Sequence, residues 1–318
     1  MTPAPLAAIT GGTGFVGLHL VPALARSGFR LRLLARRPPT HPALAGLAFE
    51  TVPGALQDET ALANLVKGAD VIIHAAGLIK AHSRAAFLKT NQGGTEALAK
   101  AARLHAPQAR FLLVSSLAAR EPGLSPYAFS KREAENAALQ AYEQAPGQLT
   151  LVRPPAIYGP WDQETLPLFQ ASKRRFVPLL SRGKAALIHA DDAADALVAL
   201  AGPGFRPGRF ALADARPEGY SMRDIFTAAS QATGGQPHFF QLPGPLLLAA
   251  GAVSGLWGRT RRVPPIFTLG KAREILHPDW SVPPAECLPK DIHTPRISLK
   301  DGFAQTVAWY RQAGWLHD

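Results

Sequence analysis

Cysteine is almost absent from the chain, which has only Cys287 among its 318 residues. A single cysteine cannot form an internal disulfide or a cysteine-rich metal site, so the sequence fits a protein of a reducing compartment. The ten histidines form no H-E-x-x-H motif or comparable metal signature. We therefore predict no bound metal.

Charged residues are also scarce, at 18% against the roughly 25% usual for soluble domains. With 47% apolar residues, a wholly disordered chain is excluded. Acidic residues are the rarer kind, 23 against 34 basic ones, which gives a net charge of +11. Such a balance alone would suggest an anionic partner, but the basic residues are spread along the chain and no nucleic-acid motif is present. We predict a solvated basic surface and no nucleic-acid partner.

Long hydrophobic runs are missing, because no apolar segment reaches the about 20 residues of a membrane span. The segment from Leu242 to Gly258 has 17 residues without a charge, but Pro243 and Pro245 interrupt its start. We expect a helix buried in a small lobe. A weak contact with a membrane surface stays open, because three basic residues follow directly: Arg259, Arg261 and Arg262. The amino terminus has no basic region ahead of an apolar run, so we expect no signal peptide and a cytoplasmic location.

The first 210 or so residues alternate short apolar runs with Ala- and Leu-rich helical stretches. This pattern is typical of βαβ units and predicts an α/β fold with a doubly wound parallel sheet. The expected strands are Leu6 to Thr10, Leu31 to Leu34, Val71 to His74, Phe111 to Ser115 and Leu149 to Arg153. We predict a dinucleotide-binding domain over 1–160 and 186–213, with a smaller interleaved substrate lobe over 161–185 and 214–318.

A glycine-rich loop follows the first expected strand and satisfies both G-x-G-x-x-G and T-G-x-x-G-x-x-G. Glycines at a strand-to-helix junction allow a tight turn and close approach of the backbone to a pyrophosphate, which the helix amino terminus attracts. Because the loop lies between an expected strand and an expected helix, nucleotide binding is a better interpretation of it than packing alone. The expected cofactor-binding residues of this loop are Gly11, Gly12, Thr13, Gly14, Phe15, Val16 and Gly17.

The second expected strand ends without an acidic residue. A loop specific for NAD would have Asp or Glu there to bind the ribose 2′-hydroxyl. This chain has Arg36 and Arg37 instead, whose guanidinium groups suit a 2′-phosphate. The sequence therefore predicts that NADP(H) is preferred over NAD(H).

A tyrosine and a lysine four residues apart, Tyr127 and Lys131, open a later helical stretch. Residues four apart share a helix face, and a nearby ammonium favours the phenolate, which makes the phenol useful as a general acid/base. Ser115 and Ser116 follow the fourth expected strand at its carboxyl end, where open α/β sheets bind ligands. The sequence alone does not decide which serine faces the substrate, and we prefer Ser116.

Together these motifs resemble the short-chain dehydrogenase/reductase superfamily. The similarity lies with its extended or atypical branch, the NAD(P)-dependent epimerase/dehydratase and 3β-hydroxysteroid-dehydrogenase-like group, and covers nearly the whole chain. Further matching pieces are His74-Ala75-Ala76-Gly77, Asn91-Gln92-Gly93-Gly94-Thr95, Arg153-Pro154-Pro155-Ala156-Ile157-Tyr158-Gly159-Pro160, and Gly314-Trp315-Leu316 near the end.

The resemblance implies a role for several of these residues. Tyr127 would be the acid/base, Lys131 would bind the nicotinamide ribose and lower the tyrosine pKa, and a serine would polarise the substrate oxygen. Asn91 would lie behind them as the fourth catalytic residue. The remaining cofactor-binding residues would be Asp58, near the adenine, with Ala75, Ala76, Gly77 and Pro154.

We predict an NADP(H)-dependent oxidoreductase that acts on a hydroxyl or carbonyl group of a small molecule. One alternative is a sugar-nucleotide epimerase or dehydratase, although only eleven residues separate Ser116 from Tyr127, fewer than such epimerases carry there. The other is a non-catalytic nucleotide-binding assembly protein similar to the complex I accessory subunit. The substrate and the oligomeric state, a homodimer included, stay open.

Overall fold

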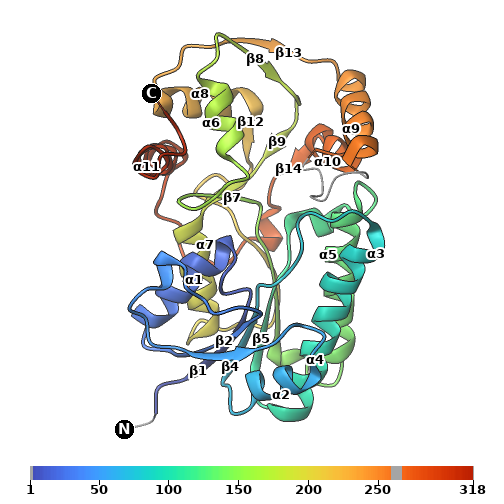
Figure 1. The fold of residues 1–318 in the computed structure, drawn as a ribbon, viewed down its shortest axis with the longest axis vertical. Coiled ribbons are helices and arrows are strands. Elements are labelled where there is room, and N and C mark those ends of the chain that lie inside the picture. The colour runs from blue at the N-terminus through green and yellow to red at the C-terminus, as the bar shows by residue number, and fades with distance from the viewer. Residues whose placement is uncertain (1–2, 259–266, 318) are drawn as a thin grey trace. The chain divides into compact units, whose positions relative to one another are not determined.

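The computed structural model describes residues 3–258 and 267–317. It divides into two compact units (Figure 1). Unit 1 comprises residues 1–153, 194–210 and 288–293, and unit 2 comprises 154–193, 211–287 and 294–318. Arg259, Arg261 and Arg262, the basic residues of the membrane-contact hypothesis, lie outside the described residues.

Unit 1 is built on a seven-stranded sheet in the order β11-β6-β5-β4-β1-β2-β3. Strands β1 to β6 pair in parallel. This is the doubly wound order of nucleotide-binding folds, and it confirms the predicted fold class. The strands are β1 (Leu6–Thr10), β2 (Arg30–Ala35), β3 (Glu50–Pro53), β4 (Val71–His74), β5 (Arg110–Val114), β6 (Leu149–Arg153) and β11 (Gly208–Ala211).

Helices cover both faces of this sheet, α1 and α7 on one side and α2, α4 and α5 on the other (Figure 1). The central strands are therefore mostly apolar, and β1 and β4 are buried at every position. The helices and helical turns are α1 (Phe15–Arg26), η1 (Pro42–Leu44), α2 (Glu59–Val66), α3 (Arg84–Phe87), η2 (Leu88–Gln92), α4 (Gly93–His105), η3 (Leu117–Arg120), α5 (Pro126–Ala141), η4 (Pro146–Gln148) and α7 (Ala190–Ala201).

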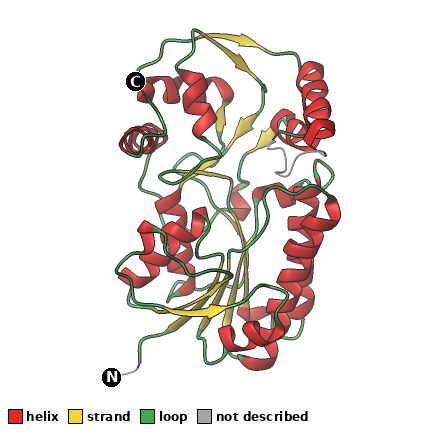
Figure 2. Ribbon diagram, in the orientation of Figure 1, coloured by secondary structure: helices red, strands yellow, loops and turns green. Residues whose placement is uncertain are grey.

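Unit 2 has only small sheets, of two or three strands each (Figure 2). Its core packs aromatic rings, with Phe303 in contact with both Tyr158 and Phe169. Its elements are β7 (Ala156–Tyr158), α6 (Leu166–Ser172), β8 (Phe176–Leu179), β9 (Lys184–Ala185), β10 (Leu187–His189), β12 (Tyr220–Ser221), α8 (Met222–Thr233), β13 (His238–Gln241), α9 (Gly244–Gly258), α10 (Leu269–Leu276), β14 (Asp279–Trp280), η5 (Pro284–Glu286) and α11 (Leu299–Gln312).

The division into units differs from the predicted domain boundaries near residues 154–160 and 186–193. Strands β7 and β10 pair with each other and not with the large sheet, so both belong to unit 2. The short strands β9 and β10 follow each other closely in sequence but join different sheets.

The expectation that the apolar segment from Leu242 is buried is wrong for one of its faces. Helix α9 buries Leu247 and Gly251, but Leu246 and Val253 are 57% and 63% exposed. A helix that packs on one neighbouring helix can bury only one stripe of its surface.

Candidate active site

The glycine loop turns from β1 into α1 within unit 1. Gly11 has a φ of +77°, and a Cβ on it would lie 2.5 Å from the backbone N of Ala76. A Cβ on Gly17 would lie 2.2 Å from the carbonyl oxygen of Gly11. Both positions therefore require glycine. The glycine loop, which follows β1, therefore packs against the backbone of Ala75 and Ala76, which follow β4.

The amino terminus of α1 is open to an anion. Its N-cap residue is Gly14, which has no side chain to cap the helix, and the first turn contains no acidic residue. Thr13 and Gly14 are exposed, and Phe15 is half-buried. The first N–H groups and the helix dipole therefore point at a site suited to a phosphate group, so these residues fit a dinucleotide cofactor.

Arg36 and Arg37 are exposed directly after the carboxyl end of β2, as the sequence predicts. The neighbouring arginine on the strand, Arg32, is engaged elsewhere, because it donates to Glu50 and to the carbonyls at the end of α2. Asp58 caps α2 by accepting a hydrogen bond from Ala61 N at 2.9 Å. Its contact with adenine stays a prediction.

Helix α5 carries the predicted tyrosine and lysine. Ser125 caps the helix by accepting a hydrogen bond from Ala128 N, so Tyr127 and Lys131 lie in its first two turns. Lys131 is buried, and its Nζ donates to the carbonyl oxygen of Val114, the last residue of β5, at 2.9 Å. Burial lowers the pKa of Lys131 to about 8, although the Glu135 carboxylate opposes the shift. The lysine thus links α5 to the strand end that precedes the two serines.

The two serines have different environments. Ser115 is buried, and its hydroxyl donates to the Glu135 carboxylate at 2.6 Å. Ser116 is half-buried and accepts a hydrogen bond from Ala118 N, which leaves its own proton able to donate. This geometry favours Ser116 as the group that contacts a substrate oxygen.

Asn91 is buried in the π-helical turn η2 and holds the loop after β4. Its Oδ1 accepts from Leu78 N at 2.7 Å, and its Nδ2 donates to Leu78 O and to Ser130 Oγ. A Cβ on Gly77 would lie 3.2 Å from Asn91 Oδ1 and 3.7 Å from Lys131 Nζ. The side-chain ends of Asn91 and Lys131 therefore both lie beside Gly77. Ser130, between Tyr127 and Lys131 in sequence, is a partner that the sequence reasoning missed.

A buried hydrogen-bond chain lies behind this loop. His74 Nδ1 is 2.6 Å from Thr10 Oγ1, and His74 Nε2 is 3.0 Å from Thr95 Oγ1, which donates to Asn91 O. The Thr95 proton is used on Asn91, so Nε2 carries the histidine proton and Nδ1 accepts from Thr10. Burial, together with the charge of Lys131, lowers the pKa of His74 to about 3. His74 therefore stays neutral and has a structural role.

A buried ion pair, absent from the sequence prediction, joins α5 to β6. Glu135 accepts two hydrogen bonds from Arg153, at 2.8 and 2.7 Å, and both side chains are at most 2% exposed. The same carboxylate accepts a hydrogen bond from the Ser115 hydroxyl and raises the pKa of Lys131. Glu135 thus organises the residues around the site without facing a substrate.

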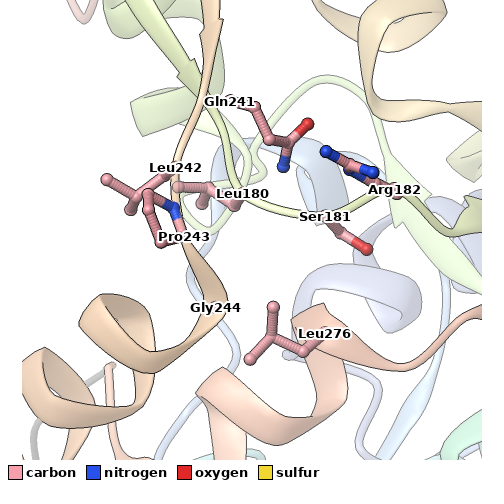
Figure 3. Close-up of a pocket in the computed structure, with 8 residues that line it drawn as sticks. All are labelled: Leu180, Ser181, Arg182, Gln241, Leu242, Pro243, Gly244 and Leu276. Carbon is pink, nitrogen blue, oxygen red and sulfur yellow. The ribbon is translucent and has the colours of Figure 1, made fainter.

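Pro154, the last of the predicted cofactor-binding residues, is buried and is the first residue of unit 2. Unit 2 contains a cavity of roughly 350 Å³. Leu276 points into this region from α10, while Leu180, Leu242 and Pro243 lie together on another side (Figure 3). Ser181, Arg182 and Gln241 add polar groups to a lining that is otherwise apolar.

Two further features bear on the earlier expectations. In the part of the chain that the structure describes, no group of three or more His, Cys, Asp or Glu residues could hold a metal ion. Across the same residues, no helix combines the length and the apolar character that crossing a membrane requires.

The model of the NAD dependent epimerase/dehydratase family matches residues 7–212. The chain belongs to this family. It is an NAD(P)-dependent enzyme of the short-chain dehydrogenase/reductase type, as the glycine loop and the Tyr127-Lys131 pair predict.

Three relatives illustrate the range of the family. The ceramide reductase of Caulobacter vibrioides is 49% identical over 314 residues, which cover 97% of this chain and 95% of the relative. A mitochondrial NADH dehydrogenase (ubiquinone) 1 alpha subcomplex subunit 9 of Arabidopsis thaliana is 30% identical over 61% of this chain and 49% of that protein. The crystal structure of a dTDP-glucose 4,6-dehydratase of Streptomyces venezuelae, with NAD bound, superposes with a TM-score of 0.73 at 20% identity, covering 98% of each chain. At that identity the structural likeness shows the fold alone.

Proposed function

We propose that the protein is an NADP(H)-dependent oxidoreductase that interconverts a carbonyl and a hydroxyl group through Ser116, Tyr127 and Lys131. The observation that carries the proposal is the burial of Lys131 on the same helix face as Tyr127, with its ammonium on the strand end that leads to Ser116. Burying a lysine is costly, and a purely structural helix gains nothing from it.

The chain's own residues supply the proton chemistry. In the direction of reduction, the Ser116 hydroxyl donates a hydrogen bond to the carbonyl oxygen, and the Tyr127 hydroxyl transfers its proton to that oxygen. The Lys131 ammonium stabilises the phenolate that remains. Asn91 holds the loop after β4 against Ser130 and so keeps this face of α5 in place. When bound, the nicotinamide supplies the hydride to the carbonyl carbon.

The cofactor would lie along the carboxyl ends of the strands of unit 1. The glycine loop and the amino terminus of α1 would hold its pyrophosphate. Arg36 and Arg37 favour NADP(H) over NAD(H), because they are exposed where an acidic residue would otherwise take the 2′-hydroxyl.

We further propose that the substrate is a ceramide-type lipid, an N-acylated long-chain amino alcohol or the corresponding ketone. Support comes from the 49% identity to a ceramide reductase over nearly the full length of both proteins. The cavity of unit 2 has apolar side chains, Leu180, Leu242, Pro243 and Leu276, that are consistent with a hydrocarbon chain.

A non-catalytic assembly role is the second candidate, and the partial similarity to an NADH dehydrogenase subunit favours it. That match spans about half of the subunit, whereas the ceramide reductase matches throughout. A scaffold also needs neither a buried lysine beside a tyrosine nor a half-buried serine at a strand end.

Turnover of purified protein tests the proposal. NADPH oxidation would be followed with a ketone of a ceramide-type lipid in detergent, and in parallel with a sugar nucleotide and with NADH. We expect oxidation of NADPH by the lipid ketone and much slower oxidation in the other arms. Absence of turnover with the lipid ketone, or faster turnover with the sugar nucleotide, would overturn it.

A further inference from the structure

In the described part of unit 2, the large exposed apolar side chains lie on strands β8 and β13 and on helix α9. Phe176 on β8 is 58% exposed and Phe240 on β13 is 47% exposed. Helix α9, which follows β13 after a short turn, adds Leu246 and Val253 at 57% and 63%. We call Phe176, Phe240, Leu246 and Val253 the apolar patch.

Over its described side chains, residues 244–255, helix α9 leaves one face exposed. Leu246, Ala249, Ala250 and Val253 are exposed at a helical spacing of three and four residues, and the helix contains no charged residue. The opposite face packs on α10, where a Cβ on Gly251 would lie 2.8 Å from Thr268 O. An exposed helix face normally carries polar or charged residues, so this face is suited to an apolar environment.

Strands β8 and β13 present a second apolar edge. They pair in parallel with Phe176 opposite His238 and Phe240 opposite Pro178. Val177 and Phe239 face the small core around Phe226, so the alternation of a strand directs Phe176 and Phe240 to the other side. The two exposed rings therefore share one face of the ribbon.

The two stretches of sequence that carry the apolar patch contain basic residues and no acidic ones. The sequence contains no Asp or Glu from 165 to 190 or from 225 to 273, and all four residues of the patch fall in these two stretches. The described basic residues of the stretches include Arg174, Arg175, Arg182, Lys184 and Arg273, all of which are exposed. Exposed Phe and Leu side chains on stretches whose charged residues are all basic match the surface of an anionic bilayer.

We propose that the apolar patch docks unit 2 onto an anionic phospholipid bilayer, with α9 lying in the interface. At 15 residues, α9 is about 22 Å long, shorter than the roughly 30 Å hydrocarbon core, so it lies on the membrane and does not span it. Docking stands on exposure and charge alone. Delivery of the substrate by the bilayer is a further step that rests on the proposed function. It is supported by Pro243, directly before α9, and Gly244, the first residue of α9, which both line the cavity of unit 2 (Figure 3).

Vesicle sedimentation with the full chain tests docking. The probes are vesicles of phosphatidylcholine alone and of phosphatidylcholine mixed with phosphatidylglycerol. We expect binding to the mixed vesicles only, weakening as salt is added. Leu246→Glu with Val253→Glu should lower the partition coefficient at least about tenfold, and loss of Arg175 or Arg182 about fivefold each.

A matched control uses exposed leucines of unit 1, Leu104→Glu with Leu139→Glu, which should bind as the wild type does. Binding of NADPH shows whether each variant is folded. If Leu246→Glu with Val253→Glu is not folded, Leu246→Ser with Val253→Ser replaces it. The proposal is overturned if the wild type ignores the mixed vesicles or if the patch variants bind equally well. The proposal is also overturned if the wild type forms a dimer without lipid and the patch variants are monomers, because the patch then binds a second copy of the chain.

Activity separates this proposal from the proposed function. The patch variant should reduce a short-chain, water-soluble ketone as fast as the wild type and lose activity on a long-chain ketone in mixed vesicles. Failure of the wild type with both ketones contradicts the proposed function and leaves vesicle binding as an independent result. Equal activity of both proteins on the vesicle-bound ketone contradicts delivery by docking.

Discussion

Arg36 and Arg37 are the residues on which the proposed preference for NADP(H) rests. Both are exposed at the end of β2, and each can make a charge-assisted contact with a 2′-phosphate. Losing such a contact costs about 1.5–3 kcal/mol. Replacing Arg36 with Ala should therefore weaken NADPH binding by about 10- to 100-fold and leave NADH binding nearly unchanged.

Fluorescence titration of both cofactors checks this prediction. Arg30→Ala is the matched control, because Arg30 is exposed at the opposite end of the same strand. Equal affinities of the wild type for NADPH and NADH would refute the preference.

Ser115 and Ser116 are adjacent in sequence but are expected to respond differently to mutation. Ser116→Ala removes the donor to the substrate oxygen and should lower kcat about 100-fold or more, by analogy with the loss of one oxyanion donor. Ser115→Ala removes a buried hydrogen bond to Glu135 and should mainly lower the free energy of unfolding, by about 1–3 kcal/mol. Steady-state kinetics and urea unfolding of both variants distinguish the two roles. The reverse pattern would assign the chemistry to Ser115.

At the scale of elements, the Glu135–Arg153 pair connects α5, which carries Tyr127 and Lys131, to β6. Glu135→Gln removes the carboxylate that accepts two hydrogen bonds from the buried Arg153 guanidinium, which should lower the free energy of unfolding by about 3–5 kcal/mol. Adding Arg153→Met should recover part of this loss, because it removes the buried guanidinium that lost the carboxylate. Urea unfolding measures both effects.

Glu135 also affects the pKa of Lys131. The carboxylate raises a lysine pKa that burial lowers to about 8. Without the carboxylate, the ammonium loses its proton at lower pH, so the alkaline decline of kcat/KM in Glu135→Gln should begin at lower pH than in the wild type. A profile that is unchanged, or that moves to higher pH, would show that Lys131 does not respond to Glu135.

At the scale of the whole molecule, unit 1 follows closely from local sequence signals. Strands β1, β4 and β6 are apolar runs buried on both faces, so their bounds are predictable from composition alone. Strand β3 is missing from the prediction, because Val52 is its only buried residue and the run carries no apolar pattern. The glycine loop and the Tyr127-Lys131 pair are predictable because their spacing is fixed by the local backbone.

Features that depend on distant contacts could not be predicted. The pair of Glu135 and Arg153, and the chain of Thr10, His74 and Thr95, join residues that only the sheet brings together. Unit 2 has short strands in separate small sheets, whose pairing no periodicity specifies. The exposed face of α9 could not be predicted either, because the helix has apolar residues on every side and no polar face marks the solvent.

The central claim is that Tyr127 moves the proton. Tyr127→Phe keeps the ring and removes only the hydroxyl, while Tyr142→Phe makes the same change at the far end of the same helix. Comparing single-turnover oxidation of bound NADPH by the lipid ketone in these two variants and the wild type tests the claim most directly. We predict unchanged NADPH affinity in all three, a rate about 10²–10⁴-fold lower in Tyr127→Phe alone, and a near wild-type rate in Tyr142→Phe. Turnover by Tyr127→Phe at the wild-type rate would contradict the account.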